Sequence, residues 1–210
     1  MRTFFASLML VLFAGAASAQ IFTPEYKGHD KGYVVISVGG SRNPRDMTFA
    51  PIVLFYRSTD SDNSRHGSVR YARPDWWNPM TQRPDYRDSD ESGVVEVRAL
   101  EPGHYEFHSF LAHQPGHDYQ AEFSIPFTIR PGEITYVGDY KFVEVRGEGA
   151  EEVHNAKESY FVVRNRSRRD LSIAHLKEEH PQGQVNVQIA DFSMVRSPFF
   201  RPDQQAELSR

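Results

Sequence analysis

The stretch from Gly93 to Ala112 reads GVVEVRALEPGHYEFHSFLA and carries the clearest structural signal in the chain. In its first half, Val95, Val97 and Ala99 alternate with other residues in the two-residue period of a half-buried β-strand. The sequence Glu101-Pro102-Gly103 follows, and Pro and Gly are the residues that stop strands and form tight turns. The stretch therefore predicts two strands joined by a turn.

This stretch contributes two runs, Gly93–Leu100 and His104–Ala112, and five further runs of the same kind are separated by Gly, Pro and Asp. They are Gly32–Val38, Pro51–Arg57, Ala121–Arg130, Glu133–Val145 and Ser159–Arg166. Seven or so short strands with turns between them favour a mainly β fold, an immunoglobulin-like β-sandwich. The 15 Phe and 10 Tyr residues can fill the space between two sheets.

One domain is expected over residues 20–196, because a chain of this length suits a single core. Ser58–Ser92 interrupts the strand pattern with a polar run that is too long for a hairpin loop, so we interpret it as a functional or partly disordered insertion. Residues 197–210 are expected to form a loosely ordered tail.

A single short helix is predicted near the C-terminus, at Asp170–Glu179. Asp170 is expected to cap it, with Leu171, Ala174 and Leu176 along one side. A last strand is predicted at Gln184–Ile189, with its apolar side chains turned inward; these are Val185, Val187 and Ile189.

The first residues have the composition of a cleavable signal peptide. Arg2 provides the positive charge, Phe4–Ala16 provides an apolar segment too short for a stable membrane helix, and Ala17-Ser18-Ala19 provides the small residues of a cleavage site. The mature chain is therefore predicted to begin at Gln20. A Cys that could take a lipid does not follow the apolar segment, so the expected location is periplasmic or secreted, and no stable membrane insertion is expected.

Composition narrows the function further. The chain has no Cys, which excludes disulfides, thiolate metal sites and Cys nucleophiles. Removal of residues 1–19 leaves 23 basic and 28 acidic side chains, a net charge of −5. This mild acidity argues against nucleic acid as a partner.

Two segments carry a family resemblance. Leu100–Phe107 contains Pro-Gly-His-Tyr at the start of a strand, and Phe127–Asp139 contains Arg-Pro-Gly-Glu followed by Tyr136-Val137-Gly138. This pattern resembles poorly characterised bacterial envelope proteins with a transthyretin-like or carboxypeptidase-regulatory-like sandwich. The resemblance implies a fold and an envelope setting, and it implies no catalytic residue.

Aromatic residues in the insertion are the candidate ligand-binding residues: Trp76, Trp77, Tyr71 and Tyr86. Exposed tryptophans can stack on sugars or anchor a protein partner. The alternative is that Trp76 and Trp77 cover one end of the sandwich.

Histidines supply the competing hypothesis of a metal-dependent hydrolase. His104, Glu106 and His108 would share one face of a strand, and imidazole and carboxylate are zinc ligands. Residues four apart in a strand are about 13 Å apart, so one ion would also need His113 or His117. The alternative is a solvated strand face with Tyr105, Phe107 and Ser109 turned towards the core.

Two charged segments are weaker candidates. Asp88–Gly93 has oxygen ligands at the first positions of a calcium loop, but Ala99 stands where the bidentate Glu is required. Arg164, Arg166 and Arg168, joined by Arg169, could form an anion-binding stripe or a solvated strand edge.

The sequence thus favours an exported binding or structural module of the cell envelope. It is expected to contact a protein or glycan partner, without a cofactor or metal and without catalysis.

Overall fold

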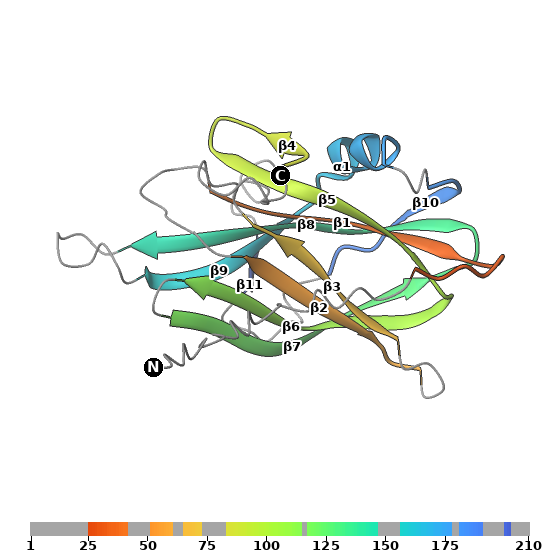
Figure 1. The fold of residues 1–210 in the computed structure, drawn as a ribbon, viewed down its shortest axis with the longest axis horizontal. Helices are drawn as coiled ribbons and strands as arrows, with labels where there is room; N and C mark the ends of the chain where they lie inside the picture. Colours follow the sequence, from red (N-terminus) through yellow and green to blue (C-terminus); the bar gives the residue numbers. More distant parts are fainter. Residues whose placement is uncertain are drawn as a thin grey trace, which may run out of the picture.

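Two β-sheets packed face to face form the body of the protein in this computed structural model (Figure 1). The structure describes residues 25–41, 51–60, 65–72, 83–114, 117–146, 156–177, 181–190 and 200–202. Within these residues the fold is a mainly β sandwich with one short helix, which confirms the predicted fold class. No helix in these ranges is long and apolar enough to cross a bilayer.

The larger sheet has the strand order β11-β9-β8-β1-β5-β4, with β10 also paired to β8. Its strands are β1 (Gly32–Ser41), β4 (Tyr86–Arg87), β5 (Glu91–Leu100), β8 (Glu133–Arg146), β9 (Ala156–Arg164), β10 (Gln184–Val187) and β11 (Phe200–Pro202). The smaller sheet has the order β3-β2-β6-β7. Its strands are β2 (Ile52–Ser58), β3 (His66–Tyr71), β6 (Gly103–Gln114) and β7 (His117–Ile129).

Neighbours in the chain pair as antiparallel hairpins: β2 with β3, β4 with β5, β6 with β7 and β8 with β9. The chain passes from one sheet to the other between these pairs. β1 lies inside the larger sheet, between β5 and β8, and runs parallel to β8. All seven predicted runs are strands. The segment 58–92 is not a loop throughout, because it contains β3 and β4 and its last residues begin β5.

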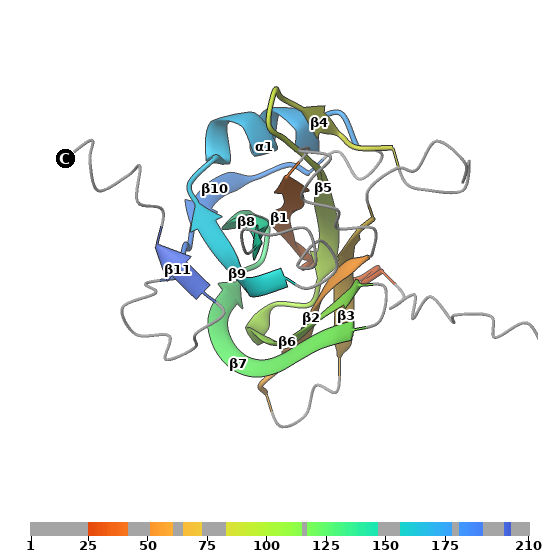
Figure 2. The same cartoon turned by 90° about the vertical axis from the view of Figure 1, so that its left-hand side faces the viewer.

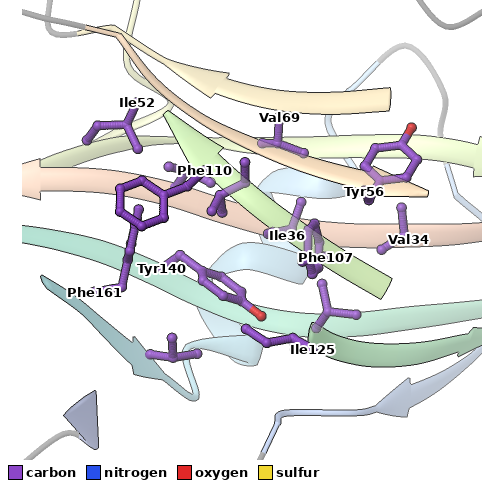
Figure 3. Close-up of a cluster of buried hydrophobic side chains, with 14 of the residues drawn as sticks. Val34, Ile36, Ile52, Tyr56, Val69, Phe107, Phe110, Ile125, Tyr140 and Phe161 are labelled. Carbon is purple, nitrogen blue, oxygen red and sulfur yellow. The ribbon is translucent and has the colours of Figure 1, made fainter. Parts of the chain in front are cut away.

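Aromatic side chains fill the space between the sheets (Figure 3). The Phe110 and Phe161 rings meet edge to face with centroids 5.1 Å apart, and Phe107 and Phe127 stack at 5.0 Å. Such pairs contribute about 0.5–1.5 kcal/mol each beyond the area that they bury. The aromatic-rich composition therefore supplies a core that needs no disulfide.

A tight turn joins β7 to β8, as predicted. The Glu133 N–H donates to the Arg130 carbonyl at 3.2 Å, and Gly132 between them has a φ of 66°. Pro131 before a glycine with positive φ is the pattern of a type II turn, because the pyrrolidine ring and the glycine each match one central position.

A β-bulge in β8 changes which side chains reach the outer face of the larger sheet. Val35 of β1 pairs with Tyr136, but Ser37 pairs with Asp139, so β8 carries one extra residue there. Gly138 lies within the bulge and has a φ of 119°, a conformation that glycine adopts at low cost. As a result, Asp139 faces the same side as Tyr136 instead of entering the aromatic core.

Helix α1 (Ser167–Ala174) lies across this outer face (Figure 2). It covers a second apolar cluster that includes Val35, Val95, Val97 and Tyr136. The predicted helix therefore exists, but it begins three residues earlier than expected.

The predicted cap of α1 is wrong. Asp170 is fully buried within the helix and faces the sheet, and Asn165 accepts a hydrogen bond from the Ser167 N–H at 3.1 Å. Leu176 lies beyond the helix end and is 83% exposed, so it does not line the apolar side.

The last predicted strand also differs from the structure. β10 ends at Val187, and Val185 and Val187 are 41% and 46% exposed. Ile189, which follows the strand, packs against both apolar clusters. β10 is a short edge strand, where one face receives no second layer, and the alternating pattern alone does not reveal this.

Candidate functional site

A groove lies on the outer face of the smaller sheet, with a volume of about 460 Å³. Phe55 and His108 form an aromatic part of its wall, and Arg57, Arg65 and His66 add polar and basic groups. In the part of the chain that the structure describes, no strand or helix covers this face, whereas α1 covers the outer face of the larger sheet (Figure 2).

Strand irregularity brings His108 next to Phe55. On β2, Phe55 pairs with Ser109 and Tyr56 pairs with Phe107, so His108 is an extra residue without a partner on that strand. The His108 and Phe55 rings lie 6.5 Å apart and tilted. Partial burial lowers the pKa of His108, and the positive charge of Arg57 lowers it further. The imidazole is therefore neutral at pH 7 and behaves as an aromatic surface.

The arginines at the groove are held by carboxylates. Arg57 binds Glu106 through Nε at 2.8 Å and Nη2 at 2.7 Å. Arg65 binds Glu101 through Nε at 2.6 Å, and its guanidinium stacks on the Tyr26 ring at 4.6 Å. These contacts fix the positions of both guanidinium groups. In Arg57 they engage Nε and Nη2 of a guanidinium that has five N–H donors.

The predicted histidine group is divided among different partners. His104 Nδ1 lies 3.1 Å from Asp60 Oδ1, whereas Glu106 binds Arg57 and also accepts from Ser124. The His104 N–H and imidazole both lower the pKa of Asp60. In the described ranges, no three His, Asp or Glu side chains are placed to hold a metal ion. The side chains of His113 and His117 lie outside those that the structure describes.

The predicted alternation of β6 holds only in part. Tyr105 and Phe107 enter the core, as expected. Beyond the irregularity at His108, Phe110 and not Ser109 joins the core cluster, although Ser109 is also buried. The extra residue has shifted the pattern by one position.

The aromatic residues predicted to bind a ligand do not form one surface. Tyr71 is buried in the core between the sheets, and its hydroxyl lies 2.7 Å from Ser92 Oγ. Tyr86 is buried on the opposite face of the larger sheet. Trp76 and Trp77 lie outside the described residues, so their role stays a prediction.

Charged side chains form a second candidate site beneath α1. Its members come from β5, β8, β9 and α1, and four of the five are at most 9% exposed. They are Glu91, Asp139, Arg164, Arg169 and Asp170, which we call the ionic cluster.

Arg164 joins two strands through the ionic cluster. Its Nη1 lies 2.7 Å from Glu91 Oε2, and its Nε lies 3.0 Å from Asp139 Oδ2, which Nη2 also contacts. Burial alone would lower the pKa of Arg164, but these hydrogen bonds and negative charges outweigh it and raise the pKa. The guanidinium therefore stays charged where the end of β9 meets the start of β5 and the middle of β8.

Arg169 connects the helix to the same carboxylates. Its Nε donates to Asp170 Oδ1 at 2.8 Å, and its Nη1 lies 3.3 Å from Glu91 Oε1. The guanidinium also stacks on the Tyr86 ring, 3.6 Å from the centroid. A planar, delocalised cation suits this position because it can stack and form hydrogen bonds at once.

The ionic cluster accounts for the two charged segments that were the weaker candidates in the sequence. The arginines do not form a strand-end stripe, because β9 ends at Arg164 and Arg168 lies on α1. The possible calcium loop at 88–93 is the β4–β5 turn, in which the Asp88 N–H donates to the Glu91 carbonyl at 2.9 Å. Glu91 is buried against Arg164 and Lys141 and is unavailable as a calcium ligand.

The fold and these sites define a β-sandwich with one outer face closed by a helix and a groove on the other. Comparison with family models, curated proteins and solved structures finds no match to this chain.

Proposed function

We propose that this protein is an exported binding module of the bacterial cell envelope that holds a glycan in the groove of the smaller sheet. The observation that carries the proposal is the Phe55–His108 aromatic wall beside the Arg57 guanidinium. A sugar ring can pack on the aromatic surface while an arginine binds a carboxylate or hydroxyl of the sugar.

The contrast between the two outer faces supports this assignment. A sandwich buries the inner faces of its sheets, and its outward side chains are normally polar. On the smaller sheet, however, the half-buried Val53, Phe55 and Leu111 face outward across neighbouring strands. The groove volume lies in the range of sites for small ligands, which favours a short glycan over a large protein interface.

The exposed Arg57 favours an acidic glycan. Its side chain is 57% exposed even though it binds Glu106 through Nε and Nη2. A uronic acid carboxylate matches the fork geometry of the Arg57 guanidinium. The neutral His108 adds a hydrogen-bonding ring without adding charge.

The envelope setting depends on the signal peptide and the transthyretin-like resemblance described above. Mass spectrometry of the protein from a periplasmic fraction should find an N-terminus at Gln20. A chain that retains residues 1–19 in the cytoplasm would contradict the proposed location.

Binding can be measured by calorimetry with oligosaccharides of uronic acids and with neutral oligosaccharides of equal length. We expect the acidic set to bind, and Phe55→Ala to weaken binding at least about fivefold, since a desolvated aromatic contact contributes about 1–3 kcal/mol. Leu176→Ala is the matched control, because it truncates an exposed apolar side chain after α1. Unchanged binding by Phe55→Ala would rule out the groove.

Trp76 and Trp77 provide a second arm for the same assay. If Trp76 and Trp77, and not the groove, contact the partner, the variant with both tryptophans replaced by alanine loses binding and Phe55→Ala retains it. Loss of stability in the double variant would instead identify the tryptophans as packing residues.

A further inference from the structure

The hydroxyl of Ser37 lies between two buried carboxylates. Its Oγ is 2.8 Å from Asp139 Oδ1 and 2.8 Å from Asp170 Oδ2. All three side chains are fully buried. A hydroxyl has one proton and can donate to one of these oxygens, so two short O···O contacts need a second proton.

The other donors around the carboxylates indicate where this second proton lies. Asp139 accepts from two nitrogens of Arg164 and from the Tyr86 hydroxyl at 3.2 Å, so it is held as a carboxylate. Asp170 accepts one bond from Arg169 and one, at 2.7 Å, from the neutral hydroxyl of Tyr136. Protonation of Asp170 therefore weakens fewer charged hydrogen bonds than protonation of Asp139 would.

The arginine contacts point to the same residue. Two nitrogens of Arg164 contact Asp139, whereas Arg169 contacts Asp170 through Nε alone, and Asp170 is fully buried. A neutral acid can be buried at much lower cost than an unbalanced carboxylate.

We propose that, below its midpoint in the folded protein, Asp170 carries a proton and donates to Ser37, which donates to Asp139. One proton thus completes a hydrogen-bonded chain from α1 through β1 to β8. The proton stays on these oxygens, and no covalent bond changes. Tyr136 still donates to Asp170, and it accepts the Arg166 N–H at 3.1 Å.

The chain makes the attachment of α1 sensitive to pH. Burial raises the pKa of Asp170, although the hydrogen bonds from Arg169 and Tyr136 and the charge of Arg169 oppose this. The attachment is complete below the pKa of an unfolded Asp and weakens as the pH rises through the higher pKa of the folded state. The charged or titratable groups around Asp170 come from each neighbouring element: Tyr86 (β4), Glu91 (β5), Tyr136, Asp139 and Lys141 (β8), Arg164 (β9) and Arg169 (α1).

The test is a carboxyl ¹³C NMR titration of the purified protein labelled at aspartate. We expect one buried Asp signal that titrates above the usual value of about 3.9 and that disappears in Asp170→Asn. Asp30→Asn, at an exposed position, should leave that signal in place. A midpoint for Asp170 at or below about 3.9, or assignment of the high midpoint to Asp139, would overturn the proposal.

Hydrogen exchange of the α1 amides, corrected for the intrinsic effect of pH, gives an independent readout. Protection should fall as the pH passes the Asp170 midpoint in the natural protein and should stay level in Asp170→Asn. Equal pH dependence in the two proteins would also overturn the proposal. If Asp170→Asn does not fold, sequence-specific NMR assignment of the natural protein identifies the Asp170 carboxyl signal instead, so the titration remains decisive.

Discussion

Replacement of Arg164 by methionine tests whether the ionic cluster holds the larger sheet together. The side chain is 9% exposed and bonds to Glu91 on β5 and to Asp139 on β8. Methionine keeps much of the length and apolar volume of the side chain but removes every N–H donor. The change therefore isolates the charge and hydrogen bonds from the packing.

The expected cost follows from the burial of the partners. Glu91 and Asp139 keep their contacts with Arg169, at 3.3 and 3.4 Å, but lose the shorter contacts with Arg164. Removal of one member of a buried ion pair costs about 3–5 kcal/mol, because the remaining charge stays buried without compensation. In a domain of this size that corresponds to a fall in Tm of roughly 6–20 °C.

The pH dependence of stability gives a second estimate, the contribution of Glu91 to the free energy of unfolding. Burial alone would raise the pKa of Glu91, but hydrogen bonds and positive charge from Arg164 and Lys141 lower it from 4.5 to about 2. The folded pKa is below the unfolded value, so the stabilisation is present above about 4.5 and is lost as the pH falls through about 2. The difference amounts to about 3 kcal/mol, and most of it should disappear in Arg164→Met.

Urea unfolding at pH 7 and at several pH values down to 3 measures both effects. Arg168→Met is the matched control, because Arg168 lies on α1 with its side chain exposed and should change the unfolding free energy by less than about 0.5 kcal/mol. A loss of under 1 kcal/mol in Arg164→Met, with the acid dependence unchanged, would refute the reasoning.

Three smaller changes test other parts of the fold by the same unfolding assay. Among the described residues, the Tyr140 hydroxyl is a buried polar atom without a hydrogen-bond partner, so Tyr140→Phe should leave stability unchanged or raise it by about 1 kcal/mol; a loss above 1 kcal/mol would reveal a partner. Gly138→Ala should lower the free energy of unfolding by about 1–3 kcal/mol, and by more than Gly132→Ala. A Cβ at 138 would lie 3.0 Å from a side chain, whereas a Cβ at 132 would meet open space, so equal losses in the two variants would contradict the bulge. Gln188→Ala should cost about 1–2 kcal/mol, because its amide bonds both backbone groups of Thr128 at 2.8 and 2.9 Å, and a neutral result would exclude this tie between the sheets.

Alternation and turn residues were sufficient to predict the seven main strands, because each run is apolar on at least one face and Gly, Pro or Asp separates most runs from the next. They could not predict that the alternation of inward and outward side chains shifts by one residue at His108 and at Gly138. A bulge adds one residue and moves every later side chain to the other face, while the composition stays the same. The glycine at 138 was a visible signal, but glycine also serves in ordinary turns.

The ionic cluster was hidden for a different reason. Glu91 and Arg164 lie in polar stretches that resemble solvated loops and strand edges, and their partners are distant in the sequence. Local patterns report the face of a strand, but not which helix or strand will cover that face. Asp170 was likewise predicted as a cap because Asp commonly begins helices, whereas here tertiary contacts outweigh that preference.

The positions of the ionic cluster along the chain also bear on the order of folding. The Glu91–Arg164 contact joins residues that are 73 positions apart in the sequence, and the Ser37–Asp170 contact joins residues that are 133 positions apart. During synthesis, residues 1–163 supply Lys141 as a cation for Glu91, but they supply neither of the arginines that contact Asp139. Long loops must also close before these contacts form. A chain interrupted before residue 164 therefore lacks both cations that contact the buried Asp139, and this charge in the larger sheet is balanced only once the segment with Arg164 and Arg169 has been made.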